Sequence, residues 1–290
     1  MTVDRRGDSP PPTPGFRPEP ASTAVRLGLR TVAGGYLLLL VALPLVAVVY
    51  VSLQAGPGQF WRDITHPLAR EALRLTLLLS VLAAAVNTVM GTLTAWVLVR
   101  CSFPGRSLLN ALIDLPFAMP TLVTGLMLVA LYGPQSWLGA WLEGVGLSVV
   151  FARPGILLAL LVVTYPFVVR TVQPALEQLD PRQEEAALTL GADRPAAFRH
   201  VILPEILPGV VSGALLTFSR CIGEFGSVVV VAGNIPGRTL TAPVYIYAQI
   251  ESDLPRSAAA VSVVLLSTSL LLLFVGEYLS RGARAGGGRE

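Results

Sequence analysis

Residues 180–204 have the sequence DPRQEEAALTLGADRPAAFRHVILP and form a polar stretch between two long apolar segments. Asp180 can cap a helix that begins at Pro181, a position where the missing amide proton of proline costs nothing. Gly191 suits the left-handed residue that follows the end of such a helix. Asp193 can then cap a second short helix. The stretch predicts two short helices joined at a glycine, the first of about ten residues and about 15 Å.

The apolar segments around this loop predict the fold class. A membrane-spanning helix needs roughly 20 mostly apolar residues, because the hydrocarbon core of a bilayer is about 30 Å thick. Six segments meet this requirement: residues 31–53, 72–99, 107–132, 155–172, 205–232 and 257–279. We therefore expect an all-α membrane protein with six transmembrane helices, in which the polar stretch connects the fourth helix to the fifth.

The composition agrees with a membrane protein and excludes several function classes. Of 290 residues, 53% are hydrophobic and 13% are charged, and the mean hydropathy is +0.66. All 21 basic residues are arginine, so the chain has no lysine for a nucleotide-binding P-loop or for a Schiff base. The net charge of +3 is too small, and the arginines are too scattered, for a surface that binds nucleic acid.

The distribution of arginines predicts the orientation in the membrane. With the N-terminus inside, fourteen arginines fall in cytoplasmic segments, and five fall outside: Arg62, Arg70, Arg153, Arg238 and Arg256. Cytoplasmic loops carry an excess of basic residues, so both termini are expected in the cytoplasm. We expect a disordered, proline- and arginine-rich tail at residues 1–30, a membrane domain at residues 31–280 and a second cytoplasmic tail at residues 281–290.

Four charged residues within the predicted spans need an explanation, because charges in a bilayer are costly and usually face the interior of a helix bundle. They are Asp114, Arg170, Arg220 and Glu224. Arg220 and Glu224 are four residues apart and can pair on one helix face. They could line an anion pathway, with Asp114 and Ser227, or form a buried pair that holds two helices together; both interpretations stay open. Arg170 could extend to the cytoplasmic edge, and Asp114 could pair with either arginine.

The polar loop also carries a specific pattern. It consists of Glu185-Ala186-Ala187, three residues, Gly191, nine residues and Val201-Ile202-Leu203-Pro204. The pattern closely resembles the EAA signature of binding-protein-dependent ABC importer permeases, with valine at 201 in place of the usual isoleucine. That resemblance implies a coupling helix that docks in a groove of a cytoplasmic ATPase. The contact residues would be Glu184, Glu185, Ala186, Ala187, Gly191 and Ala192. On physical grounds alone, an amphipathic connector on the membrane surface would explain the loop equally well.

Similarity to one group of these permeases extends beyond the loop. Four stretches resemble the T-type subunit of sulfate/thiosulfate permeases: AWVLVRC at 95–101, ALIDLPFAMPT at 111–121, YPFVVRTVQPALEQ at 165–178 and FSRCIGEFGSVVVVAGN at 218–234. The FAMP run at 117–120 favours the T-type subunit over its W-type sister.

The resemblance implies the architecture of a type I ABC importer permease (MetI-like) in a bacterial inner membrane, where the chain forms half of a translocation channel. The chain itself would be non-catalytic and without a cofactor, because ATP–Mg would bind to a cytoplasmic ATPase dimer. Its other partners would be a W-type permease or a second copy of this chain, an extracytoplasmic sulfate-binding protein and the lipid bilayer.

Three alternatives stay open at this point. The chain could be an ABC permease for another oxyanion, chiefly thiosulfate, molybdate or phosphate. It could also be a secondary transporter driven by an ion gradient, although such proteins often show inverted repeats and midplane carboxylates, and the sequence has no convincing internal repeat. A membrane-embedded enzyme would need clustered nucleophiles, metal ligands or carboxylate pairs, and the sequence shows no such cluster.

Overall fold

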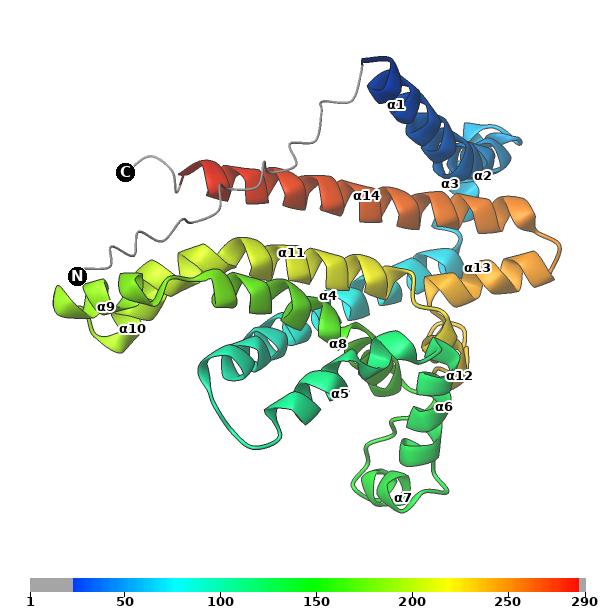
Figure 1. The fold of residues 1–290 in the computed structure, drawn as a ribbon. Helices are drawn as coiled ribbons and strands as arrows, with labels where there is room; N and C mark the ends of the chain where they lie inside the picture. The colour runs from blue at the N-terminus through cyan, green and yellow to red at the C-terminus, as the bar shows by residue number, and fades with distance from the viewer. Residues whose placement is uncertain (1–22, 287–290) are drawn as a thin grey trace, which may run out of the picture. The chain divides into compact units, whose positions relative to one another are not determined.

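The computed structural model describes residues 23–286 and contains only helices and their connections over that range (Figure 1). The chain divides into two compact units between Ala47 and Val48. The first unit includes α1 (Thr23–Leu37), the π-helical turn η1 (Leu38–Ala42) and the beginning of α2 (Leu43–Leu53). Together these elements form a continuous helix that is long and apolar enough to cross a membrane, from Leu27 to Leu53.

The second unit holds the remaining helices. Its long helices are α4 (Pro67–Arg100), α8 (Arg153–Gln178), α11 (Leu203–Ile222) and α14 (Pro255–Gly286). The shorter ones are α3 (Pro57–Thr65), α5 (Arg106–Ala118), α6 (Thr121–Tyr132), α7 (Trp137–Gly144), α9 (Pro181–Thr189), α10 (Arg194–Ala197), the π-helical turn η2 (Phe198–Ile202), α12 (Gly226–Val231) and α13 (Ala242–Glu251).

Close packing of α4, α8 and α11 forms the centre of this unit. A Cβ atom at Gly91 of α4 would lie 2.8 Å from the Cβ of Val168 in α8, and one at Gly213 of α11 would lie 3.0 Å from the Cα of Val168. Both glycines therefore let a neighbouring helix approach more closely than any larger residue would. Small residues serve this purpose in membrane helices, where van der Waals packing drives helix association.

Two π-helical turns each precede a proline. The turn η1 ends two residues before Pro44, and η2 ends two residues before Pro204. A proline within a helix lacks an amide proton and clashes with the carbonyl four residues earlier. The wider π-turn accommodates that clash, so the helix continues through both prolines instead of breaking.

The predicted all-α membrane fold is confirmed. Over residues 23–286, five helices are long and apolar enough to cross a bilayer, or six if the bent pair α5 and α6 forms one span. The predicted span at 107–132 is not one straight helix but the bent pair α5 and α6, which meet at an angle of 112°. Met119 adopts an extended conformation, as the residue before a proline prefers, and Pro120 is the N-cap of α6.

The predicted single helix at 205–232 is wrong. The helix α11 ends at Ile222, and the short helix α12 begins only at Gly226. The intervening residues are Gly223, Glu224 and Phe225. After this break, α12 packs closely on α6, where a Cβ atom at Gly125 would lie 2.6 Å from the carbonyl oxygen of Ser227.

The predicted tails lie largely outside the described residues. Of the N-terminal segment 1–30, residues 1–22 are not described, and the remainder belongs to α1. Of the C-terminal segment 281–290, residues 287–290 are not described, and the helix α14 continues to Gly286.

Candidate functional site

The loop between α8 and α11 folds as the sequence predicts. The Asp180 carboxylate accepts a hydrogen bond of 3.0 Å from the amide of Arg182, at the start of α9. At the other end of the helix, Gly191 has φ = +91°, and the amide of Ala192 donates to the carbonyl of Ala187 at 3.1 Å. This six-residue closure is typical of a glycine-terminated helix. Asp193 caps α10 through the amide of Ala196 at 2.8 Å.

Most of the predicted coupling residues lie on the surface. Glu185, Ala186 and Gly191 are exposed, while Ala187 and Ala192 are half-buried. Leu190 is the most exposed large apolar side chain of this loop, at 89%, and nothing in the described part of the chain covers it. The end of α9 therefore presents an apolar surface beside an acidic residue, as a helix that docks into another protein would.

Glu184 differs from its neighbours, because it contacts a transmembrane helix. Its carboxylate forms an ion pair of 3.0 Å with Arg100, the last residue of α4. The Arg100 guanidinium also lies over the ring of Trp96, 5.4 Å from its centroid. Trp96 in turn makes an edge-to-face contact of 5.4 Å with Phe198 in η2. The loop is thus attached to the end of α4 at two places.

Asp114 and Arg170 connect α5 to α8. The Asp114 carboxylate accepts two hydrogen bonds from Arg170, from Nε at 2.7 Å and from one terminal nitrogen at 2.6 Å. The remaining guanidinium protons go to the Asn110 side chain and carbonyl and to Gln173. All five donors of the arginine are therefore in use. Of the two pairings that the sequence left open for Asp114, the structure shows the one with Arg170.

Arg220 and Glu224 form the predicted ion pair, at 2.6 Å. Glu224 lies in the break after α11 and is only 2% exposed. Its second carboxylate oxygen accepts from the amide and the hydroxyl of Ser227, at 2.9 and 2.8 Å. The carboxylate therefore both neutralises Arg220 and caps the first turn of α12. Of the four predicted pathway residues, three meet here, whereas Asp114 belongs to the network around Arg170.

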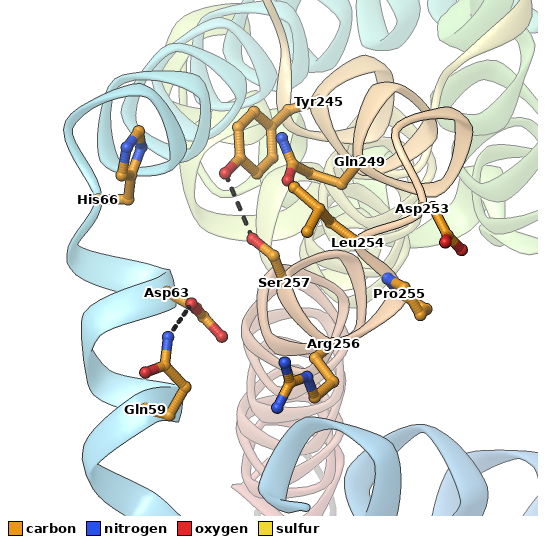
Figure 2. A pocket seen from close by; sticks show the side chains of 10 residues that line it. All are labelled: Gln59, Asp63, His66, Tyr245, Gln249, Asp253, Leu254, Pro255, Arg256 and Ser257. Carbon is orange, nitrogen blue, oxygen red and sulfur yellow. Dashed lines mark hydrogen bonds between the residues drawn. The ribbon is translucent and has the colours of Figure 1, made fainter. Parts of the chain in front are cut away.

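A polar pocket of about 420 Å³ lies where α3 and the start of α4 face the turn between α13 and α14. In Figure 2, Gln59, Asp63 and His66 lie on one side of it, and Tyr245 and Ser257 lie on the other. Gln59 donates to Asp63 at 2.8 Å, and the hydroxyls of Tyr245 and Ser257 are 3.5 Å apart. The pocket includes Asp253 and Arg256, at the end of the segment after α12 that the sequence predicts to be extracytoplasmic.

Residues 87–285 match the family described as the binding-protein-dependent transport system inner membrane component. This chain belongs to that family. It is a multi-pass, non-catalytic membrane subunit of an ABC transport system, as the EAA pattern in the polar loop predicts.

Curated relatives cover nearly the whole chain. The chain is 43% identical over 249 residues to the sulfate transport system permease protein CysT of Synechocystis sp.. The aligned residues make up 86% of this chain and 87% of the relative. It is 39% identical over 262 residues to the sulfate transport system permease protein CysW of the same organism, and the aligned residues make up 90% of this chain and 95% of that relative.

Solved structures show the same fold. A bacterial ABC transporter involved in the import of alginate superposes with a TM-score of 0.74 at 17% identity, over 89% of this chain and 95% of that chain. The MetNI methionine ABC transporter, in an inward-facing conformation, superposes with a TM-score of 0.57 at 20% identity, over 79% of this chain and 99% of that chain. The predicted type I, MetI-like architecture is confirmed.

Two residues that matter for this permease subunit escaped the sequence analysis. Arg100 and Trp96 lie in the AWVLVRC stretch, which carried the resemblance but received no role of its own. A signal was present, because Arg100 ends a long apolar segment directly before a polar loop. Its partner Glu184 lies far along the chain, so the pairing required the fold.

Proposed function

We propose that this chain is the T-type permease subunit of a sulfate/thiosulfate importer and forms half of its translocation channel. The observation that carries the proposal is its 43% identity to a sulfate permease CysT across 86% of the chain, against 39% to the W-type relative of the same organism. The FAMP run at 117–120 supports the same assignment.

In this proposal, α9 is the coupling helix and docks on a cytoplasmic ABC ATPase dimer. The exposed Glu185, Ala186 and Leu190 at the end of α9 would enter the groove of the ATPase. Gly191 would end the helix without a side chain in the way. Glu184 would have a different task, since its ion pair with Arg100 connects α9 to the membrane domain.

The remaining partners follow from the same assignment. A W-type permease, or a second copy of this chain, would supply the other half of the channel. The ATPase dimer would bind ATP–Mg, and this chain would hold no cofactor. With both termini in the cytoplasm of a bacterium, the connections at the far ends of α4 and α8 would face an extracytoplasmic sulfate-binding protein.

Arg220, Glu224 and Ser227 are the candidates for the translocation pathway. Arg220 is about one-third exposed although its carboxylate partner is buried, so part of its guanidinium can still meet an anion. Asp114 has weaker support, because both of its oxygens are engaged by Arg170.

Sulfate uptake into proteoliposomes tests this proposal. The assembled transporter, with its ATPase, partner permease and binding protein, should import labelled sulfate only when ATP is supplied on the ATPase side. Thiosulfate, molybdate and phosphate, each offered as competitor, rank the anions. Uptake driven by a proton or sodium gradient without ATP would contradict the proposal, and preferential uptake of molybdate or phosphate would replace sulfate as the cargo.

A further inference from the structure

Three arginines from separate elements line one pocket of about 290 Å³. They are Arg74 in α4, Arg153 at the start of α8 and Arg238 in the connection between α12 and α13. Among the described residues, Glu71 is the acidic side chain that shares this lining. Three positive charges against one negative charge leave the pocket with a formal charge of +2.

The pocket lies at the end of the helices opposite the coupling loop. Arg74 and Arg100 belong to the same helix, α4, and are 26 residues apart. At 1.5 Å per residue they are separated by about 39 Å along the helix axis, which is close to the full thickness of a bilayer. Because Arg100 contacts the coupling loop, Arg74 marks the opposite membrane surface.

Among the described residues, the three arginines have no carboxylate partner, unlike Arg100, Arg170 and Arg220. Arg170 and Arg220 each have a carboxylate at 2.6 Å. Over residues 23–286, no ion pair within 4.0 Å involves Arg74, Arg153 or Arg238. All three side chains are exposed and line the same pocket, so their guanidinium groups are open to an anion that enters it.

Hydrogen bonds hold part of this pocket in place before any ligand arrives. The Arg153 Nε donates to the carbonyl of Arg238 at 3.1 Å, which leaves both terminal nitrogens of Arg153 free to face the pocket. The carbonyl of Ile235 accepts from the amides of Arg238, Thr239 and Leu240, at 3.1, 2.9 and 3.1 Å. The Thr239 hydroxyl, in a side chain only 2% exposed, accepts from the amide of Ile235 at 3.0 Å. These bonds fix the turn that carries Arg238.

The start of α8 adds to the positive potential. The helix has 26 residues, and its N-cap Ala152 forms no side-chain capping bond. The N-terminus of a helix carries about half a positive charge from its aligned peptide dipoles. An anion beside Arg153 would therefore meet both a guanidinium and the positive end of a long helix.

We propose that Arg74, Arg153 and Arg238 form a reception site for a tetrahedral dianion such as sulfate, on the side of the membrane opposite the coupling loop. The formal charge of +2 matches a dianion, and planar guanidinium groups bind such oxyanions through paired hydrogen bonds. In the transport cycle the site receives the anion as it leaves the binding protein. That step rests on the proposed function, whereas the binding site itself does not.

Chemical protection tests the binding site without any transport. Phenylglyoxal modifies accessible arginines, and peptide mass spectrometry reports the rate at each position of the assembled transporter in phosphatidylcholine nanodiscs. Sulfate should slow modification of Arg74 and Arg238 about tenfold relative to Arg70, which lies one turn away on α4 but outside the pocket. Equal rates with sulfate and with chloride of the same ionic strength would overturn the proposal. Protection by phosphatidylglycerol alone, with none from sulfate, would also overturn it, because the ligand would then be a lipid headgroup.

Transport by neutral variants tests the role of the site. The triple variant Arg74→Gln, Arg153→Gln, Arg238→Gln should assemble and lose about tenfold in sulfate uptake at limiting binding protein. Arg70→Gln removes one charge from the same helix end and should transport as the wild type does. Uptake by the triple variant equal to that of Arg70→Gln would contradict the reception site and leave the proposed function standing. A wild type that imports no sulfate would instead contradict the proposed function, while the protection experiment still decides on the site.

Discussion

Arg100, the last residue of α4, forms an ion pair of 3.0 Å with Glu184 in the first turn of α9. Both charges are favourably placed, because a cation stabilises the end of a helix and an anion stabilises the beginning. The pair joins a membrane-spanning helix of 34 residues to the helix that we assign to ATPase coupling. In the proposed function we expect this contact to pass a movement of α9 to α4, together with the contact between the Trp96 and Phe198 rings.

Removal of this ion pair should uncouple the two helices with little loss of stability. Both side chains are about one-quarter exposed, so the pair contributes at most about 1 kcal/mol to folding. We expect Glu184→Gln to assemble normally and to transport less sulfate for each ATP hydrolysed. Measurement of uptake and hydrolysis on the same proteoliposomes gives this ratio. A Glu184→Gln transporter with the wild-type ratio would show that the pair is not part of the coupling.

Asp114→Asn should loosen α5 from α8. The substitution removes the charge from a bidentate contact with Arg170, and hydrogen bonds to charged groups contribute about 1.5–3 kcal/mol when well shielded. Asp114 is about half exposed, so we expect a loss below this range, about 1 kcal/mol, measured as a lower midpoint of thermal unfolding in detergent. Arg170→Lys should show a similar loss, since a lysine cannot replace the five-donor fork. Unchanged midpoints for both variants would contradict a structural role for this network.

Variants of Arg220 and Glu224 can separate the contribution of this ion pair to stability from its contribution to transport. Glu224→Gln leaves Arg220 without its charged partner, and we expect a loss of about 2–3 kcal/mol, because one half of a largely buried ion pair is costly to keep alone. The double variant Arg220→Gln, Glu224→Gln removes both charges and should recover most of this stability. If the pair lines the pathway, as proposed, the double variant should still transport less sulfate. A double variant with normal stability and normal uptake would assign the pair to packing only.

Gly91 provides a test of the helix packing at the centre of the fold. Gly91→Val adds a side chain where even a Cβ atom would lie 2.8 Å from that of Val168, so α4 and α8 must separate. Overpacking of this kind costs about 1–3 kcal/mol, measured as a lower unfolding midpoint. The matched control is Gly58→Ala in α3, whose added Cβ meets nothing within 4 Å. Equal midpoints for the two variants would show that α4 and α8 are not in close contact here.

The parts of the fold that depend on residues close together in the sequence could be predicted. The caps at Asp180 and Asp193 and the left-handed Gly191 all follow from residue types next to a helix end, and all three are present. The length of each apolar segment likewise indicated where the membrane-spanning helices lie, because it too is a local property of the sequence. The EAA pattern identified the family, which the comparisons confirmed.

The structure differs from six straight spans where a helix breaks inside an apolar segment. Hydrophobicity alone predicts continuous helices through Met119 and through Gly223, because the residues on both sides suit a membrane. The 112° bend between α5 and α6 and the end of α11 at Ile222 instead reflect the restriction before Pro120 and the capping of α12 by Glu224. The sequence left open which arginine pairs with Asp114, because Asp114 and Asn110 lie more than fifty residues before Arg170.

The measurement that tests the central claim most directly is ATP hydrolysis by the assembled transporter in lipid nanodiscs, with and without sulfate-loaded binding protein. The double variant Glu185→Arg, Gly191→Trp alters the exposed end of α9. Gly105→Trp is the matched control, since it places the same side chain on another exposed glycine with positive φ. We predict that loaded binding protein stimulates hydrolysis by the wild type and by Gly105→Trp, and that the double variant assembles but loses this stimulation. Full stimulation of the double variant would contradict the assignment of α9 as the coupling helix.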